Sequence, residues 1–447
     1  MTDASTSGSM SPELMKVVER AQREPEGRFH SLAHLIDVPT LLRAYHRIRK
    51  DGAVGVDGVT KEQYGQKLQE NLESLHRRLK AKQYRHQPIR RVHIPKDNGK
   101  TRPIGISAFE DRVVQDAIRE VLQAIYEQDF LDCSHGFRPG RSAHDAIRAL
   151  DRVVHRGEVN WILEADIVSF FDSLDRTELM KLIQIRVADG SLLRLIGKCL
   201  HVGVLDGADY TEPEKGTIQG SGLSPLLGNI YLHYVLDLWV CQWRKRHARG
   251  EVYAVRYADD LVMGFQREQD ALDMRSALAG RLAKFGLELH PDKTRVLEFG
   301  RFAREGRERR GLSKPETFDF LGFTHIVGQD RRGKFQLRRR TSRKKRRAKL
   351  AVVKEECRRR RHWRVAEQHA WLSSVLRGHY QYYGVPTNSP ALASFRRAVG
   401  YLWHASLQRR SQRARWTRPQ LRHFEERYPL PPPHVVHPWP DKRFATR

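Results

Sequence analysis

Two short apolar runs flank a pair of acids in the second half of the chain. Val252–Val255 and Leu261–Phe265 have the length and composition of strands, and the segment 257–260 (YADD) lies between them. This pattern predicts a hairpin with Asp259 and Asp260 at its turn. Carboxylates beside apolar strands are costly unless a cation neutralises them, and a divalent metal ion is the strongest such partner. On its own the segment fits a solvated hairpin tip equally well, because turns favour Asp.

A second apolar run delivers a third carboxylate. Residues 161–172 (WILEADIVSFFD) predict a strand with Asp166 near its end, followed by two aromatic residues. Two-metal nucleotidyl transfer needs carboxylates from separate strands to hold two Mg²⁺ ions about 3.5–4 Å apart. Asp166 and Asp259 fit the two bridging positions, and Asp260 fits a weaker, adjacent ligand. The alternative is that Asp166 caps a turn and the aromatic residues pack in the core.

Three further segments are punctuated by glycine or proline. Residues 94–106 (IPKDNGKTRPIGI) predict a hairpin around an Asp-Asn-Gly turn, with cations at both ends. Residues 134–142 (SHGFRPGRS) predict a shaped loop, whose two arginines could contact phosphates. Residues 216–232 open with a glycine-rich loop that would let the backbone approach a ligand, and continue into a buried helix that begins at Ser224 and Pro225.

In their order and spacing these segments resemble a bacterial group II intron-encoded reverse transcriptase, an enzyme type that also acts as a maturase, in its form without a C-terminal nuclease domain. The resemblance extends over about residues 31–420 and includes 286–294, similar to a palm segment, and 318–323, similar to the primer-grip strand. It implies an α+β fold, a right-hand polymerase with fingers, an antiparallel palm sheet and a helical, basic thumb. The implied reaction is RNA-templated addition of deoxynucleotides to a primer 3′-hydroxyl, with pyrophosphate released.

The resemblance also implies the residues of the site and its cofactor. Two Mg²⁺ ions, which Mn²⁺ could replace, are the implied cofactor. Their ligands would be Asp166, Ile167, Asp259 and Asp260, of which the three acids are catalytic. The incoming deoxynucleotide would be contacted by Lys96, Arg102, Phe171, Gln219 and Lys293. One position departs from the family pattern, since Ile218 stands where proline is usual, and this leaves the geometry of its loop open.

Phe171 lies five residues after Asp166, where polymerases of this type place an aromatic ring under the sugar of the incoming nucleotide. A ring there would clash with a 2′-hydroxyl and would favour deoxynucleotides by shape alone. The alternative is that Phe171 only packs in the core.

The charge of the chain points independently to nucleic acid. The formal net charge is +28 over 447 residues, far more than solubility requires. Residues 331–361 are the densest stretch, with seventeen Lys or Arg against two Glu, and apolar residues recur near it at almost helical spacing. We therefore predict helices with one basic face that binds phosphates. The expected nucleic-acid contacts are Arg138, Arg141, Arg343, Lys344, Lys345, Arg346 and Arg377.

The sequence divides into five regions. Residues 1–29 predict a loose N-terminus, 30–90 an N-terminal extension, 91–330 the fingers and palm, 331–415 the thumb or maturase domain, and 416–447 a short, basic, proline-rich appendage that could contact DNA. The implied partners are an RNA template, a group II intron RNA whose splicing and mobility the protein would assist, a DNA primer or target, and dNTPs. The sequence predicts no oligomeric state.

The four cysteines stand singly, so the sequence predicts neither a disulfide framework nor a zinc site. A nuclease domain rich in Cys and His is likewise not expected, so mobility would depend on nicks or primers made by other enzymes. Reduced cysteines and the lack of a targeting or membrane-spanning segment predict the bacterial cytoplasm.

Two other functions stay open from the sequence alone. One is an RNA-binding splicing factor with an inactive polymerase site, although the acids and cations expected of an active site are all present. The other is a reverse transcriptase freed from its intron and used in repair or phage defence.

Overall fold

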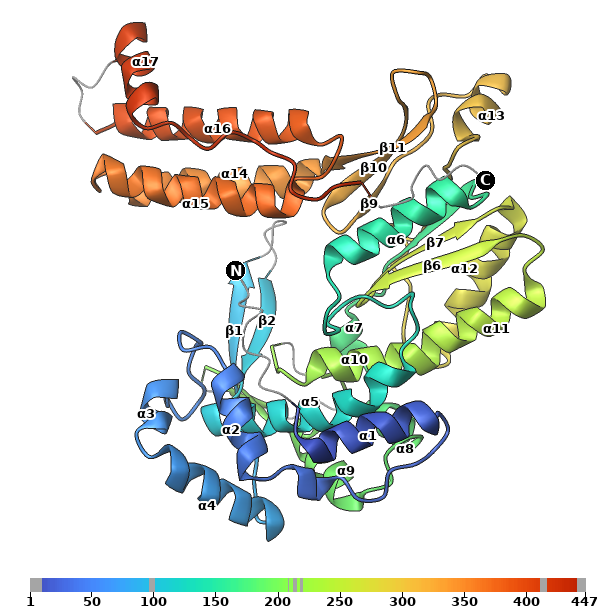
Figure 1. Ribbon diagram of the computed structural model, residues 1–447, viewed down its shortest axis with the longest axis vertical. Helices are drawn as coiled ribbons and strands as arrows, with labels where there is room; N and C mark the ends of the chain where they lie inside the picture. The colour runs from blue at the N-terminus through green and yellow to red at the C-terminus, as the bar shows by residue number, and fades with distance from the viewer. Residues whose placement is uncertain are drawn as a thin grey trace.

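The computed structural model describes residues 10–95, 101–207, 209–211, 215–217, 220–410 and 416–439. Helices and mostly antiparallel sheets alternate along the chain, which confirms the predicted α+β class. In Figure 1 the N-terminal helices lie at the bottom, the palm at the right and the thumb helices at the top. No helix among the described residues is both long and apolar enough to span a bilayer.

The N-terminal layer consists of short helices packed around one long, buried helix, α5 (Phe109–Asp129). The short helices are α1 (Pro12–Arg23), η1 (Ala33–Leu35), α2 (Val38–Arg47), α3 (Lys61–Gly65) and α4 (Leu68–Lys80). Capping side chains fix where three of them begin, because Ser11, Asp37 and Thr60 each accept a hydrogen bond from a backbone amide of the first turn. The predicted N-terminal extension is therefore helical. The loose N-terminus predicted for residues 1–29 is wrong for residues 12–23, because α1 packs on α5 and buries Leu14 and Ala21.

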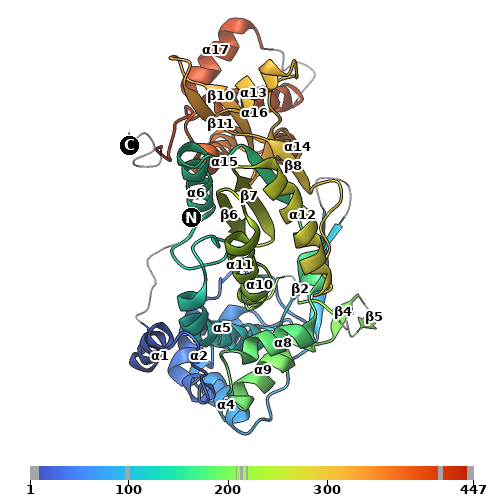
Figure 2. The ribbon, with the colours of Figure 1, turned by 90° about the vertical axis from the view of Figure 1, so that its right-hand side faces the viewer.

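The fingers sheet has the strand order β2-β1-β4-β5. Its strands are β1 (Ile89–Pro95), β2 (Thr101–Ile106), β4 (Val204–Asp206) and β5 (Asp209–Thr211). β1 and β2 pair antiparallel, as the predicted hairpin requires, and their register places Ile94 opposite Arg102. Two helices, α8 (Arg176–Gln184) and α9 (Gly190–Leu200), pack on each other, and α9 also packs on α5 of the N-terminal layer (Figure 2).

The palm is a four-stranded antiparallel sheet in the order β6-β7-β3-β8. Its strands are β6 (Val252–Tyr257), β7 (Asp260–Phe265), β3 (Trp161–Ala165) and β8 (Arg295–Glu298). Side chains alternate between two cores along β3, because Ile162 packs on the side of α6 (Ala143–Arg156) and Leu163 on the side of α12 (Glu268–Ala283). Both faces of the sheet are therefore buried, which explains why its strands are apolar runs in the sequence.

A continuous helical segment runs beneath the palm sheet. It consists of α10 (Ser224–Leu232), the π-helical turn η2 (His233–Asp237) and α11 (Leu238–His247). α10 begins at Ser224, as predicted, and is buried along its whole length apart from Pro225, which is only partly covered.

The chain leaves the palm through α13 (Ala303–Arg309) and a second antiparallel sheet in the order β11-β10-β9. The strands are β9 (Phe318–Phe320), β10 (Phe323–Gln329) and β11 (Phe335–Thr341). Phe318, Phe320 and Phe323 are buried, so the aromatic side chains of the segment 318–323 serve packing.

The thumb is formed by α14 (Arg343–Arg359), α15 (Val365–Tyr383) and α16 (Ser389–Gln408) around a core of their own. Tyr380 is buried in this core, and Tyr382 and Tyr383 pack on Phe323 of β10. The three tyrosines therefore serve packing, Tyr380 between the thumb helices and the other two between α15 and β10. Val352 of α14 is 54% exposed. The helical spacing of apolar residues near residue 350 therefore predicts a wider buried face on α14 than the structure has.

The described part of the C-terminal region packs on the thumb. α17 (Arg418–Arg427) brings Phe424 against Trp403 of α16. Residues 428–439, which we term the C-terminal strap, run back along α15 and α16 toward the palm (Figure 1).

Hydrogen bonds hold the strap at both ends of its path. The Tyr380 hydroxyl donates to the carbonyl of Pro431 at 3.0 Å. The amide of Val436 donates to the carbonyl of Gly384 at 2.8 Å. The strap then reaches α6 of the palm, where His437 stacks on His144 with 3.5 Å between ring centroids. The strap thus contacts both thumb and palm.

Candidate active site

The three predicted acids lie at one end of the palm sheet. The pairing of β3 with β7 ends at Ala165, so Asp166 and Asp260 leave the paired strands side by side. Ala258 and Asp259 form the turn from β6 into β7. The structure therefore brings together three carboxylates from two separate segments, as the sequence predicts.

The turn has an unusual backbone. Ala258 has φ +56°, in the left-handed region that residues with a β-carbon seldom adopt. The predicted loop 134–142 packs directly on this turn, because a β-carbon added to Gly136 would lie 2.4 Å from the amide nitrogen of Ala258. The amide of His135 also donates to the carbonyl of Arg256 at 2.9 Å. The loop thus supports the turn from behind.

Asp166 is fixed by a segment that follows α12. Its backbone carbonyl accepts a hydrogen bond from the amide of His290 at 2.8 Å, and Ile167 pairs with Leu289. Lys293 Nζ donates to Asp166 Oδ2 at 2.5 Å. The structure therefore places Lys293 at the acids, as an ion-pair partner.

Crowding of the acids changes their affinity for protons. Burial and the nearby charge of Asp166 raise the pKa of Asp259, while the positive charges of Arg102 and Lys293 oppose the rise. Burial, followed by the charges of Asp259 and Asp166, raises the pKa of Asp260 to about 6, although its side chain still reaches solvent. The site thus carries negative charge that its own cations do not fully offset.

The chemistry of this site suits a hard divalent cation. Carboxylate oxygens are the ligands that Mg²⁺ prefers, and a cation would offset the crowded negative charge. Across the described ranges, no group of three or more His, Cys, Asp or Glu side chains is arranged to hold a metal ion, so the three acids do not yet form a ligand set. Asp166 instead pairs with Lys293, so metal binding would require the carboxylate to exchange this partner.

The fingers hairpin contributes a cation to the site. Arg102 is exposed on β2, and its charge acts on Asp259 across the space between fingers and palm. Lys96, Gln219 and Ile218 lie outside the described residues.

Phe171 lies on α7 (Phe170–Ser173), directly after the segment that carries Asp166. Its ring is partly buried, and a β-carbon added to Gly228 would lie 3.2 Å from it. Its carbonyl accepts a hydrogen bond from the amide of Thr217 at 2.7 Å. Phe171 therefore packs in the core and also borders the glycine-rich loop.

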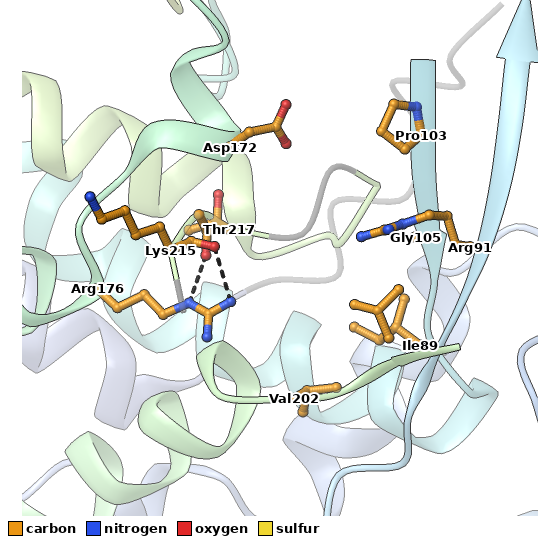
Figure 3. A pocket seen from close by; sticks show the side chains of 11 residues that line it. Ile89, Arg91, Pro103, Gly105, Asp172, Arg176, Val202, Lys215 and Thr217 are labelled. Atoms are coloured by element: carbon orange, nitrogen blue, oxygen red, sulfur yellow. Dashed lines mark hydrogen bonds between the residues drawn. The ribbon is translucent and has the colours of Figure 1, made fainter. Parts of the chain in front are cut away.

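A cavity of about 280 Å³ lies between the fingers hairpin and the α7–α8 region (Figure 3). Arg91 and Pro103 line it from the hairpin side, and Asp172 from the palm side. Arg176 of α8 donates to the carbonyl of Gly216 at 2.8 Å (Figure 3). This bond anchors the start of the glycine-rich loop beside Phe171.

The two arginines of the 134–142 loop are bound within the protein. Arg138 is buried, and its guanidinium donates to Glu127 at 2.6 Å and to the carbonyl of Ser134 at 3.0 Å. Arg141 is partly buried and donates to Asp132 at 2.7 Å. Both side chains therefore shape the loop. The burial of Arg138 leaves it no phosphate contact, whereas for the partly exposed Arg141 that contact stays a prediction.

The other expected nucleic-acid contacts lie on the thumb. Four are exposed: Arg343, Lys344, Lys345 and Arg377. Arg346 is partly buried and donates to the hydroxyl of Ser394 at 3.2 Å. A groove of about 600 Å³ between α14 and α15 is bordered by Lys349, Trp371 and Tyr382. The thumb thus presents cations beside aromatic side chains.

Sequence reasoning missed two buried residues beneath the acid turn, Arg256 and Asp237, which pair at 2.5 Å. A signal was present, because Arg256 interrupts an otherwise apolar strand directly before Tyr257. A charge in a buried strand requires a partner of opposite sign.

Residues 94–325, just over half of the chain, match the model of a protein family described as "Reverse transcriptase (RNA-dependent DNA polymerase)". The chain belongs to the reverse transcriptase family. Protein YkfC of Escherichia coli (strain K12) is 35% identical to this reverse transcriptase over 320 residues, which cover 63% of this chain and 83% of YkfC. These matches confirm the predicted polymerase fold and the predicted activity of an RNA-directed DNA polymerase.

Two further relatives are associated with introns by name. Group II intron-encoded protein LtrA of Lactococcus lactis subsp. cremoris is 38% identical over 207 residues, which cover 46% of this chain and 34% of LtrA. Nuclear intron maturase 1, mitochondrial, of Arabidopsis thaliana is 36% identical over 92 residues, 21% of this chain and 13% of the relative. The chain thus matches about a third of the length of LtrA. As a reverse transcriptase it uses an RNA template, and enzymes of this family act with divalent metal ions.

Proposed function

We propose that this reverse transcriptase extends a primer by two-metal catalysis, with Mg²⁺ held by Asp166, Asp259 and Asp260 and with Ile167 as an additional backbone ligand. The observation that carries the proposal is the convergence of three carboxylates at one sheet edge, two of them with raised pKa. When bound, the two ions would activate the primer 3′-hydroxyl and stabilise the leaving pyrophosphate. Mn²⁺ could replace Mg²⁺, because carboxylate oxygens also suit it.

The residues around the acids would bind and orient the nucleotide. Arg102, already within electrostatic reach of Asp259, would pair with phosphate oxygens of the triphosphate, together with Lys96. Phe171 would lie under the sugar, and Gln219 would contact the nucleotide from the glycine-rich loop. Lys293 would hold the Asp166 carboxylate in place in the free enzyme. When the nucleotide binds, the triphosphate would become a new anionic partner for the Lys293 ammonium group.

We further propose that the thumb binds RNA and that the protein assists the splicing and mobility of a group II intron, using DNA as primer or target. The exposed cations in the first turn of α14 support this, because the helix dipole opposes positive charge there and a phosphate would relieve it. The names of LtrA and of the Arabidopsis maturase point to the same role. The proposal keeps the predicted regions from residue 30 onward and a bacterial cytoplasmic location, and it joins α1 to the helical N-terminal layer.

The test is primer extension on poly(rA)/oligo(dT) with dTTP and Mg²⁺, comparing the natural protein with Asp259→Ala. Loss of incorporation by a variant that still folds and binds RNA is the expected result. Full incorporation by Asp259→Ala would overturn the metal assignment. A natural protein that folds and binds RNA without incorporating dTTP would instead indicate a splicing factor with an inactive polymerase site.

A further inference from the structure

Arg256 is a buried arginine in β6, directly beneath the turn that carries Asp259. Its side chain has no exposure to solvent. A charge at such a site is stable only when an opposite charge and enough hydrogen-bond acceptors surround it. The hydrogen-bond partners of Arg256 therefore indicate its structural role.

All five N–H groups of Arg256 are bound. Nε and Nη2 donate to the two carboxylate oxygens of Asp237 at 2.8 and 2.5 Å. Nη2 also donates to the hydroxyl of Ser134 at 2.8 Å. Nη1 donates to the side-chain oxygen of Asn229 at 3.1 Å and to the backbone carbonyl of Ala258 at 3.0 Å. Because a guanidinium has five donors, none is left over for a ligand.

These partners come from three segments that surround the turn. Asn229 lies on α10, Asp237 ends the π-helical turn η2, and Ser134 begins the supporting loop. Asn229 also donates to the carbonyl of Gly136 at 2.7 Å, and Gly136 in turn packs on Ala258. The hydrogen bonds thus form a closed circuit behind the turn. Short π-helical turns inside helices are frequent at functional sites, where they redirect a side chain.

We infer that Arg256 is a positioning residue of the polymerase site, which holds the left-handed turn at Ala258 so that the next residue, Asp259, presents its carboxylate to the metal ions. The inference rests on the proposed role of Asp259 as a metal ligand. The hydrogen-bond circuit reaches Asp259 through the backbone of Ala258, and the charge of Arg256 also acts on Asp259. Because lysine keeps that charge, replacing Arg256 by lysine tests the geometry of the turn alone.

Lysine is the informative replacement. Arg256→Lys keeps the positive charge beside Asp237, but an ammonium group has three donors on a flexible stem and cannot span Asp237, Asn229 and the Ala258 carbonyl in one plane. The ion pair with Asp237 would remain, and the hydrogen bond to the carbonyl of Ala258 in the turn would be lost. The two functions of the residue can therefore be separated.

The chain offers a matched control in the fingers. Arg186 is also fully buried, pairs with Asp129 at 2.9 Å, and donates to the backbone carbonyls of Glu24 and Gly27. Arg186→Lys makes the same chemical change in the same kind of environment, remote from the acids. Any general cost of replacing a buried arginine by lysine appears in both variants.

The experiment measures three quantities for the natural protein and both variants: kcat and KM for dTTP on poly(rA)/oligo(dT), the dissociation constant of Mn²⁺ from the protein alone by EPR, and the melting temperature. Arg256→Lys should lower kcat by about 10- to 100-fold with little change in KM, since an error of about 1 Å in catalytic geometry can cost this much. It should also weaken Mn²⁺ binding several-fold. Arg186→Lys should lower the melting temperature comparably and leave kcat and Mn²⁺ binding unchanged.

Two outcomes would overturn the inference. Equal effects of Arg256→Lys and Arg186→Lys on kcat and Mn²⁺ binding would make Arg256 merely structural. If Arg256→Lys does not fold, Asn229→Ala takes its place, because it breaks the bond to Gly136 and leaves the ion pair intact; unchanged kcat and Mn²⁺ binding in that variant would also refute the positioning role. Asp259→Ala separates the two proposals: if it retains Mn²⁺ binding and activity, the metal assignment itself fails.

Discussion

The palm and the thumb both concentrate charge, but they do so in opposite ways. In the palm a few charged side chains are buried or crowded and bound to defined partners, as Arg256 is to Asp237 and Lys293 is to Asp166. On the thumb, Arg343, Lys344 and Lys345 stand exposed on one helical turn.

The palm therefore depends on the exact position of each charged group, whereas the thumb depends on the number of charges that it exposes. Catalysis at a crowded site depends on where each oxygen lies, so changing one atom in the palm should lower the rate strongly. Raising the salt concentration should not have the same effect. An exposed basic face depends on how many phosphates it neutralises, so each cation contributes a small share that salt screens.

The largest effect should come from Asp259→Asn. The amide keeps the shape of the carboxylate and removes its charge, so metal-dependent primer extension should fall on the order of 10³-fold, as for loss of a principal electrostatic group. The affinity for RNA should stay the same, because the thumb is untouched. Asp273→Asn, on the exposed side of α12, is the control and should leave extension unchanged. If the affinity for RNA fell as much as primer extension, palm and thumb would not act separately, and the comparison between them would fail.

The second effect concerns the choice of sugar. Phe171→Ala should reduce the preference for dNTPs over NTPs by about 10- to 100-fold, because the predicted clash with the 2′-hydroxyl disappears. The measurement is the ratio of kcat/KM for dTTP and UTP on poly(rA)/oligo(dT). Since Phe171 is also partly buried, the melting temperature must be followed, and an unchanged ratio in a folded variant would assign the ring to packing alone.

A smaller effect should follow from Lys344→Gln combined with Lys345→Gln. Losing two phosphate contacts should reduce the slope of log Kd against log salt concentration by about 1 to 2, and kcat at saturating template should not change. Filter binding of RNA at several salt concentrations measures the slope. Lys67→Gln combined with Lys181→Gln removes two exposed cations from the N-terminal half and should leave the slope as it was.

The smallest effect should be a gain in stability. The pKa of Asp260 is raised to about 6 in the folded protein, so its ionised form destabilises the fold at neutral pH and the protonated form does not. In metal-free buffer at pH 7.5, Asp260→Asn should therefore increase the free energy of unfolding by about 1 kcal/mol after allowance for solvent screening.

This gain should shrink as the pH falls through about 6, because the natural protein then takes up the proton and loses the repulsion. Urea unfolding at pH 7.5 and pH 5 measures the difference. Polymerase activity of the natural protein should fall as the pH falls through the same range, because protonation of Asp260 competes with metal binding. A stability gain that is the same at both pH values would show that the charge of Asp260 is not its source.

Much of the palm could be predicted because its information is local. The apolar runs around Asp259 and the strand before Asp166 show in the sequence as short periodic segments, and the structure forms strands and a hairpin at those places. The pairing of Arg256 with Asp237 and Ser134 was not predictable in this way, because its partners lie on separate segments and share no periodic pattern.

The basic loop at 134–142 shows a second limit. Composition alone made Arg138 a candidate for phosphate binding, and the structure instead buries it against Glu127. An arginine that shapes a loop and an arginine that binds RNA have the same sequence signature. Only the burial of the side chain tells them apart.

The C-terminal strap has a consequence for the mechanics of the thumb. The chain connection at Ser342, between β11 and α14, would by itself act as a single hinge. The strap adds an attachment to the direct ring contact of Tyr382 with His144, because it is bonded to α15 and stacked on His144 of α6. A swing of the thumb away from the palm would have to break the stack between His437 and His144 as well as the ring contact of Tyr382 with His144. Shortening the chain near residue 416 would therefore remove one of the two ring contacts on His144 and expose the part of the thumb core that Phe424, Tyr428 and Leu430 cover.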